Sequence, residues 1–245
     1  MEEVSPIASV CACSEYFNVD DTGELCLNKG TMGLRKVVQF GSPGTYKFTK
    51  AAYPWLARVR VKVQAGGGGS AGADANSKQL ISRPGGSGGG YSESVIEVGA
   101  LAGVESVVVG AGGAGGGGNN AGSAGEASSF GGTVTAIGGN GGGDGMTTGT
   151  TNTTSSGTSA PLAGKGQITM GGGPGEGAIR MGMRGLSGRG GDSHLGFGGY
   201  GRSTSGPGGA PRGRGGGGGG AFSSDGAKYD GAPGGAGIVI IELFG

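Results

Sequence analysis

A glycine pattern in this sequence has the spacing of a nucleotide-binding loop. Gly110, Gly112 and Gly115 follow a run of three valines and fit G-x-G-x-x-G. Such a loop requires a helix directly after it, because the amides at the helix N-terminus hold the pyrophosphate. The chain instead continues as GGGNNAGSAGEASSFGG, which has too much glycine for a helix. Lys165 in AGKGQ lacks the hydroxyl residue that completes a phosphate-binding loop, so we expect no cofactor.

The sequence offers few residues for catalysis or metal binding. His194 is the only histidine and therefore the one candidate base for a Ser-His-Asp arrangement. It lies in GDSHLGFGGYG, which has little to hold a rigid geometry, so we predict that the protein is not an enzyme. Cys11 and Cys13 have C-x-C spacing rather than the usual C-x₂-C of zinc sites, and Cys26 stands apart. We interpret the three as small reduced thiols, with an inter-chain disulfide or a metal as the alternative.

Several arginines lie among glycines, a pattern found in proteins that bind RNA. Segments of this kind bind single strands by charge and by stacking on interleaved aromatic residues. The arginines are Arg184, Arg189, Arg202, Arg212 and Arg214, with Phe197 and Tyr200 between them. Only residues 189–191 and 212–216 fit the RGG pattern, no folded RNA module accompanies them, and the net charge is +1. We therefore expect no nucleic acid partner, and keep a glycine/arginine-rich RNA-associated protein or a cell-wall-type structural protein as the alternative function.

Glycine is distributed unevenly along the chain, and this distribution limits which secondary structure can position the residues above. Of the 68 glycines in 245 residues, five lie in residues 1–65 and 63 in residues 66–245. Ordinary proteins contain roughly 7% glycine. The tracts show no period of three, which excludes a collagen helix. No apolar run approaches the ~20 residues that span a bilayer, and the N-terminus lacks a secretory signal. We therefore expect a product made in the cytoplasm and not inserted into a membrane.

Alternating apolar residues predict a mostly β fold of short antiparallel strands, sandwich-like and with essentially no helix. Val59, Val61 and Val63 alternate with charged or polar residues, so a period of two places them on a buried face. Further strands are predicted at residues 92–98, 104–109, 133–137, 167–170 and 238–244. The residues of these strands that we expect in the core are Ile96, Val98, Val107, Val109, Ile238 and Ile240.

Two hairpins are predicted in the N-terminal part of the chain. A turn at residues 20–23 precedes an alternating segment at 24–28, which indicates a short hairpin. The turn sequence Ser-Pro-Gly at residues 42–44 separates apolar segments at 37–40 and 46–48, which indicates a second hairpin.

The glycine tracts are predicted to form a packed bundle of polyglycine-II segments. This helix has no internal hydrogen bonds, so each N–H and C=O faces outward. Neighbouring glycine segments can approach closely and satisfy these groups in one another. The alternative is a flexible linker. We favour the ordered bundle because the apolar strand at residues 238–244 needs a partner, so the chain must return to a fixed place after the longest tracts.

From residue 37 the chain resembles the glycine-rich domain of bacteriophage minor tail, tail-fibre and tail-tip proteins. VVQFGSPGTYKF is similar to the F-x-x-x-G-T-Y-x-F segment of that family, and LARVRVKVQAGGGG to the strand that runs into polyglycine. GGGYSESVIEV, GGGGGGAF and the closing PGGAGIVIIELF also fit, in the same order. Upstream, DDTGELCLNKGTMGLRKV is similar to the lead-in of tail proteins from phages of actinobacteria. The resemblance covers residues 20–245.

The resemblance implies a structural virion protein of the distal tail, synthesised in the host cytoplasm. It implies an attachment segment at residues 1–36, a glycine-rich domain at 37–245, and other phage tail proteins as partners. It also implies a homo-oligomer, with a trimer favoured because three copies would add to a thin core. The Ser/Thr-rich residues 146–160 are then either a solvated loop or an exposed loop for a host-surface glycan or protein. The candidate receptor contacts are Thr148, Thr151, Asn152, Thr154, Arg184, His194, Phe197 and Tyr200.

Overall fold

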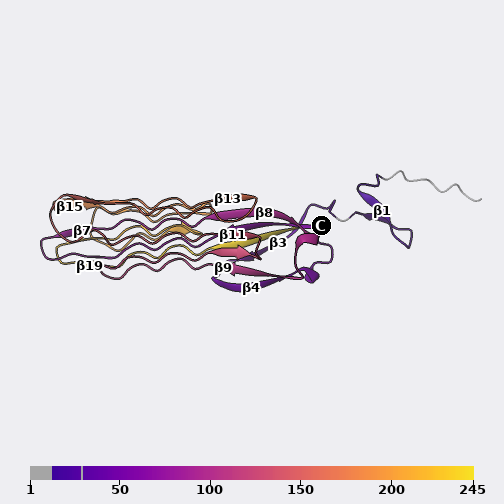
Figure 1. Cartoon of the computed structure of the whole chain (residues 1–245), viewed down its shortest axis with the longest axis horizontal. Helices are drawn as coiled ribbons and strands as arrows, with labels where there is room; N and C mark the ends of the chain where they lie inside the picture. The colour runs from indigo at the N-terminus through magenta and orange to yellow at the C-terminus, as the bar shows by residue number, and fades with distance from the viewer. Residues whose placement is uncertain (1–12, 29) are drawn as a thin grey trace, which may run out of the picture.

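The computed structural model describes residues 13–28 and 30–245, and shows an elongated, mostly β body (Figure 1). Its helical parts within these residues are two 3₁₀ turns of three residues, η1 Lys50–Ala52 and η2 Val98–Ala100. No helix of the described chain is long and apolar enough to cross a membrane. A β-sandwich forms one end of the body, short strands and turns form the other, and nearly parallel glycine-rich segments connect the two (Figure 1). The predicted fold class is confirmed.

The predicted N-terminal hairpin is present and lies beyond the sandwich end of the body (Figure 1). Strand β1 Phe17–Val19 pairs antiparallel with β2 Leu25–Leu27. The Asp20 carboxylate fixes the turn by accepting hydrogen bonds from the amides of Thr22 and Glu24. Bonds from the Thr22 hydroxyl and these amides hold the pKa of Asp20 below its usual value. Cys13 and Cys26 are free thiols, and Cys11 lies outside the described residues.

Two antiparallel sheets face each other in the sandwich. The five-stranded sheet has the order β13 Ile168–Met170, β8 Tyr91–Glu97, β5 Arg58–Gln64, β20 Ile238–Phe244 and β3 Leu34–Phe40. The four-stranded sheet has the order β11 Val134–Ala136, β10 Ser128–Phe130, β9 Val104–Val109 and β4 Gly44–Thr49. The predicted strands of the sandwich are confirmed, most within one or two residues; β3 begins three residues earlier than the predicted segment 37–40, and β10 was not predicted. Val59, Val61, Val63, Ile96, Val107 and Val109 lie in one buried cluster with Phe130, as predicted for the valines and the isoleucine.

The hairpin predicted between residues 37–40 and 46–48 is wrong. β3 pairs with β20 in the five-stranded sheet, whereas β4 pairs with β9 in the four-stranded sheet. The turn therefore carries the chain from one sheet to the other. Phe40 and Tyr46 meet across this corner with ring centroids 5.0 Å apart. A strand-turn-strand pattern is common to hairpins and to such corners, so the local sequence does not separate them.

Ile238 and Ile240 were expected in the core, and this assignment is wrong by one residue. The buried residues of β20 are Val239, Ile241 and Leu243, which lie opposite Val63, Val61 and Val59 of β5. Ile238 and Ile240 are half-buried on the outer face of the sheet. Both faces of the segment IVIIELF carry isoleucine, and only Glu242 distinguishes the outer face from the inner one.

Val98 was also expected in the core, and it lies at the edge of the core. It begins the η2 turn just after β8, is half-buried, and packs against the core cluster from beyond the end of the strand.

The buried segment at residues 66–72 donates its backbone hydrogen bonds to three different neighbours in turn. Every third residue donates to the same neighbour, with bonds of 2.9–3.1 Å. The pairs are Gly66 to Glu126, Gly69 to Ser123, Gly72 to Asn120, Gly67 to Gly235, Ser70 to Ala232 and Gly68 to Ser87. A repeat of three residues is that of the polyglycine-II helix. The acceptor numbers fall as the donor numbers rise, and for the third neighbour the bond from Ala65 to Gly90 precedes that from Gly68 to Ser87. All three neighbours therefore run antiparallel to this segment.

The carbonyls of the same segment accept from three further neighbours. Gly113 and Gly116 donate to Gly67 and Ser70, Gly139 and Gly142 donate to Gly66 and Gly69, and Gly218 donates to Gly68. The segment is thus surrounded by six others, and residues 85–90 and 215–220 are bonded in the same manner. The wavy traces of Figure 1 are these segments. The predicted ordered polyglycine-II bundle is confirmed; we call it the lattice.

Close approach of the main chains requires glycine at the lattice positions. A Cβ added to Gly68 would lie under 3.0 Å from the carbonyl oxygen of Asn140, and one added to Gly66 would lie similarly close to that of Ala111. The obstructing atoms are backbone, which cannot rotate away as a side chain can. The fold of this region is therefore determined by where side chains are absent.

Short strands close the lattice at the end opposite the sandwich, which we call the tip. The paired strands are β6 Ala73–Asp74 with β19 Lys228–Tyr229, β7 Leu80–Ser82 with β18 Phe222–Ser224, and the sheet β12 Thr153–Ser155, β14 Ala178–Met181 and β15 Arg184–Leu186. A second small core there contains Ala73, Ala75, Ile81, Met146, Ala178 and Ala221. On the flank, β16 Gly196–Phe197 pairs with β17 Arg212–Gly213.

Candidate contact surfaces at the tip and on the flank

A buried arginine holds the loops of the tip together. Arg83 is 1% exposed, and its Nε donates to the carbonyl of Gly72 at 2.7 Å. Its other nitrogens donate to the carbonyls of Asp144 and Met146 and to the side-chain oxygen of Asn119, at 2.6–2.8 Å. Burial lowers the pKa of Arg83, because the charged form loses its hydration. Three backbone carbonyls and one side-chain oxygen replace the lost water, so Arg83 joins three separate parts of the chain, at residues 72, 119 and 144–146.

A second buried arginine fastens the Ser/Thr-rich residues to the tip. Arg180 of β14 donates to the carbonyls of Thr151 at 2.8 Å, Leu80 at 2.9 Å and Thr147 at 2.5 Å. Part of this segment is strand β12, which pairs with β14. The expectation of a continuous loop at residues 146–160 is therefore wrong for its central part, because β14 offers a strand edge and Arg180 offers donors for the loop carbonyls.

Five of the predicted contact residues gather at the tip. Thr148 is half-buried, and its hydroxyl lies 3.2 Å from the Asn76 amide and 3.1 Å from the Gln79 side-chain oxygen. The Asn152 side-chain oxygen accepts from the Gly182 amide at 3.0 Å, so this residue joins the turn between β14 and β15. The other three are Thr151, whose carbonyl Arg180 binds, and the exposed Thr154 and Arg184, on β12 and β15.

An apolar groove of about 620 Å³ lies beside these residues, and sequence reasoning did not find it. Met181 is 60% exposed, and Met183 and Leu186 are also exposed. The complete lining is Ile179, Met181, Met183, Arg184, Gly185, Leu186, Ser203, Thr204, Ser205, Phe222 and Ser224. Ile179, Met181 and Met183 alternate along the sequence with a period of two, a signal that could have predicted a one-sided apolar surface.

The other three predicted contact residues are not at the tip but on the flank. The His194 ring lies on the Tyr91 ring, with centroids 4.1 Å apart, and Tyr91 belongs to the five-stranded sheet. Phe197 is on β16, and Tyr200 follows it along the lattice. A hollow of about 270 Å³ contains both Phe197 and Tyr200 in its lining, and an adjoining one of about 460 Å³ contains His194. The structure therefore divides the predicted contacts into two surfaces.

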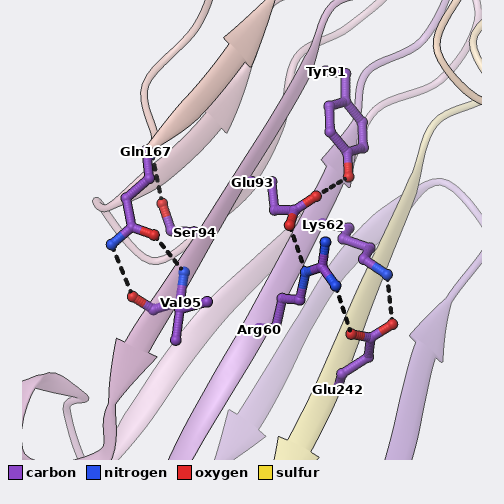
Figure 2. A network of polar contacts seen from close by, with 8 residues as sticks. All are labelled: Arg60, Lys62, Tyr91, Glu93, Ser94, Val95, Gln167 and Glu242. Carbon is purple, nitrogen blue, oxygen red and sulfur yellow. Dashed lines mark hydrogen bonds and ion pairs between the residues drawn. The ribbon is translucent and has the colours of Figure 1, made fainter.

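A network of charged residues covers the outer face of the five-stranded sheet (Figure 2). Arg60 donates to Glu93 at 2.5 Å, and Lys62 lies 2.5 Å from Glu242, which is also 3.9 Å from Arg60. The Tyr91 hydroxyl donates to the second oxygen of Glu93 at 2.6 Å. Both carboxylates are thus engaged, and the network stabilises the sheet.

The pKa values of this network follow from burial and hydrogen bonding. Burial opposes ionisation of Glu93, but the bonds from Tyr91 and Arg60 outweigh it and hold the pKa of Glu93 below its usual value. Burial and the bond to Glu93 together raise the pKa of Tyr91. In the same view, the side-chain amide of Gln167 bonds to both backbone groups of Val95 and so fixes the segment that leads into β13 (Figure 2).

The comparisons with known proteins assign the chain to a family. Residues 41–244 match a family model described as a glycine-rich domain, and this range includes the lattice, the tip and all of the sandwich except β3. The search of curated proteins found no match. Because the matched segment is most of the chain, the protein belongs to this glycine-rich domain family.

Proposed function

We propose that this member of the glycine-rich domain family is a structural protein of a bacteriophage virion, located at the distal tail and contributing to attachment to the host surface. The resemblance of its ordered motifs to tail-fibre and tail-tip proteins supports this role. The structural observation that carries it is that the body has two unlike ends, joined by a rigid lattice.

The chain enters and leaves the body at the same end. β3 begins at Leu34, which pairs with Phe244 of β20, and the Gly245 amide bonds to the carbonyl of Gly33 at 3.4 Å. The N-terminal hairpin therefore connects to the sandwich end, and the tip points away from it (Figure 1). This polarity is what an attached fibre element requires, because one end joins the assembly while the other meets a target.

We extend the proposal to a homotrimer. The outer face of the five-stranded sheet carries exposed Val37, Val95, Ile168 and Met170 around the charged network. Burial of these apolar side chains against another copy would remove their surface from water, and the charged residues between them could pair across the contact. Light scattering of the purified chain at micromolar concentration should give the mass of three copies, and a monomer at this concentration would contradict the trimer.

The alternative of an RNA-associated protein has less support in the structure. Both RGG-type stretches are part of the folded body: Gly190 donates to Gly199, and Gly215 donates to Ala236. Flexible RGG segments order themselves on RNA by stacking and charge, whereas these are already bonded into the lattice.

Two measurements test the virion role. Immunogold electron microscopy of virions, with an antibody raised against the purified chain, should label the distal end of the tail. The purified chain, added in excess, should also slow adsorption of virions to host cells. A second preparation, unfolded and refolded without recovery of its β circular dichroism, is the matched control. Virions without label, or label on the capsid, would contradict the proposal.

A further inference from the structure

The two hollows on the flank adjoin each other. They share Phe197 and Arg212, which face each other as a cross-strand pair of β16 and β17. The first hollow is also lined by Arg189, Gly198, Tyr200 and Ala210, and the second by Ser193, His194, Leu195, Gly196 and Gly213. We call the two together the flank groove.

Two aromatic rings stand in the flank groove with most of their surface in solvent. Phe197 is 68% exposed and Tyr200 is 52% exposed. The Tyr200 ring is held in place, because Arg202 donates to its hydroxyl at 2.9 Å while also donating to the carbonyl of Pro207 at 2.5 Å. Exposed apolar side chains that gather in one hollow mark binding grooves, and a ring already fixed loses little entropy when it binds a ligand.

The groove is cationic. Arg189 and Arg212 belong to its lining, and neither makes an ion pair with any residue that the structure describes. Its lining contains no carboxylate. Two carboxylates lie near the groove but outside its lining, and each accepts a backbone amide bond: Asp192 from Gly198 at 2.7 Å and Glu176 from Arg189 at 3.3 Å. Guanidinium groups bind carboxylate and phosphate oxygens through paired hydrogen bonds, so the unpaired arginines favour an anionic ligand.

From these contacts we infer that the flank groove binds an acidic saccharide, an inference that rests on the proposed attachment role for its place on the virion. The negative faces of the Phe197 and Tyr200 rings suit the polarised C–H groups on the flat side of a sugar ring. Arg189 and Arg212 then bind the acidic group of the same or the next sugar. Single-stranded RNA fits less well, because it needs a charged track along successive phosphates. The lining of this groove supplies two arginines, Arg189 and Arg212, and the third arginine beside its rings, Arg202, already bonds to Tyr200 and Pro207.

Titration calorimetry of the purified chain with oligogalacturonate tests this inference. The same oligosaccharide with its carboxyl groups reduced to alcohols is the neutral counterpart, and oligouridylate is the nucleic acid probe. We expect oligogalacturonate to bind more tightly than either, with an affinity that falls as salt is raised. Phe197→Ala should weaken binding about tenfold, as removal of one stacking ring does elsewhere. Arg212→Gln should weaken binding of the acidic form about tenfold and leave the neutral form unchanged.

Two exposed residues away from the groove provide matched controls: Tyr16→Ala beside the N-terminal hairpin and Lys47→Gln on β4 of the sandwich should both bind as the wild type does. Phe197→Leu keeps an apolar side chain without the ring, and separates loss of stacking from loss of folding. Absence of oligogalacturonate binding, unchanged affinity in Arg212→Gln, or tighter binding of oligouridylate would each overturn the inference. The two proposals can fail separately. Unlabelled tails would contradict the virion role, whereas calorimetry of the purified chain tests saccharide binding independently of that role.

Discussion

Replacement of one lattice glycine tests the main physical claim, that main-chain packing holds this body together. Gly68 lies in the fully buried segment 66–72, and an added Cβ would meet the carbonyl oxygen and carbon of Asn140 and the amide nitrogen of Gly141. All three atoms are backbone, so Gly68→Ala forces two segments apart rather than displacing a side chain.

The cost of Gly68→Ala has two parts. The two segments forced apart are joined by bonds from the Gly139 amide to the Gly66 carbonyl at 2.9 Å and from the Gly142 amide to the Gly69 carbonyl at 2.8 Å. Loss of both bonds costs about 1–3 kcal/mol, at about 0.5–1.5 kcal/mol each. Overpacking costs about 1–3 kcal/mol more, and the reduced freedom of the unfolded chain returns about 0.4–1 kcal/mol. We expect a loss of roughly 2–5 kcal/mol, a large share of the about 5–15 kcal/mol that stabilises a typical domain.

Guanidinium unfolding followed by circular dichroism measures this loss. Gly143→Ala is the matched control, because an added Cβ there would meet nothing within 4 Å. The control should unfold within about 0.5 kcal/mol of the wild type. If Gly68→Ala also unfolded at the wild-type midpoint, with unchanged amide protection in the lattice, the close approach of main chains would not be a source of stability.

Three further substitutions test other parts of the structure. Glu93→Gln should lower stability by about 1–3 kcal/mol at neutral pH, since hydrogen bonds to a charged group are lost. Because the folded pKa of Glu93 lies below its unfolded value, the wild type should lose this contribution as pH falls below about 4.5 in acid titration, and the variant should not show that loss. Arg83→Met should cost about 3–5 kcal/mol by leaving buried carbonyls unsatisfied, and should speed proteolysis of the tip loops, whereas exposed Arg184→Met should do neither. Ile241→Ala should cost about 2–5 kcal/mol in thermal unfolding, and more than Ile240→Ala; an equal loss would contradict the register of the last strand.

The sandwich could be predicted from sequence where one face of a strand is clearly polar. Charges between Val59, Val61 and Val63 determine their side of the sheet. In the last strand only Glu242 distinguishes the two faces. Ile240 is two residues from Glu242 and therefore lies on the same, outer face, which is the one signal for its position. Partners could not be predicted for the lattice, because glycine segments carry no side chains whose complementarity would specify which neighbour lies where.

The candidate surfaces could be predicted only in part. The Ser/Thr-rich segment and the aromatic residues were found because their types are unusual, but their separation into tip and flank depends on pairing within the lattice. The roles of Arg83 and Arg180 could not be foreseen, because a buried arginine that binds carbonyls has the same local sequence as one in solvent. The position of these two side chains beneath the loops follows from the three-dimensional fold and not from the local sequence.

The donor repeat of the lattice has a consequence for how such chains can change in length. Successive amides along a segment donate to different neighbouring segments, and an amide donates to the same neighbour again only after three residues. Adding one or two residues inside a tract would turn every later amide toward the wrong segment, while adding three would restore the phase. Members of the family that differ in tract length should therefore differ in multiples of three, whereas the turns at the tip are free to vary by any number.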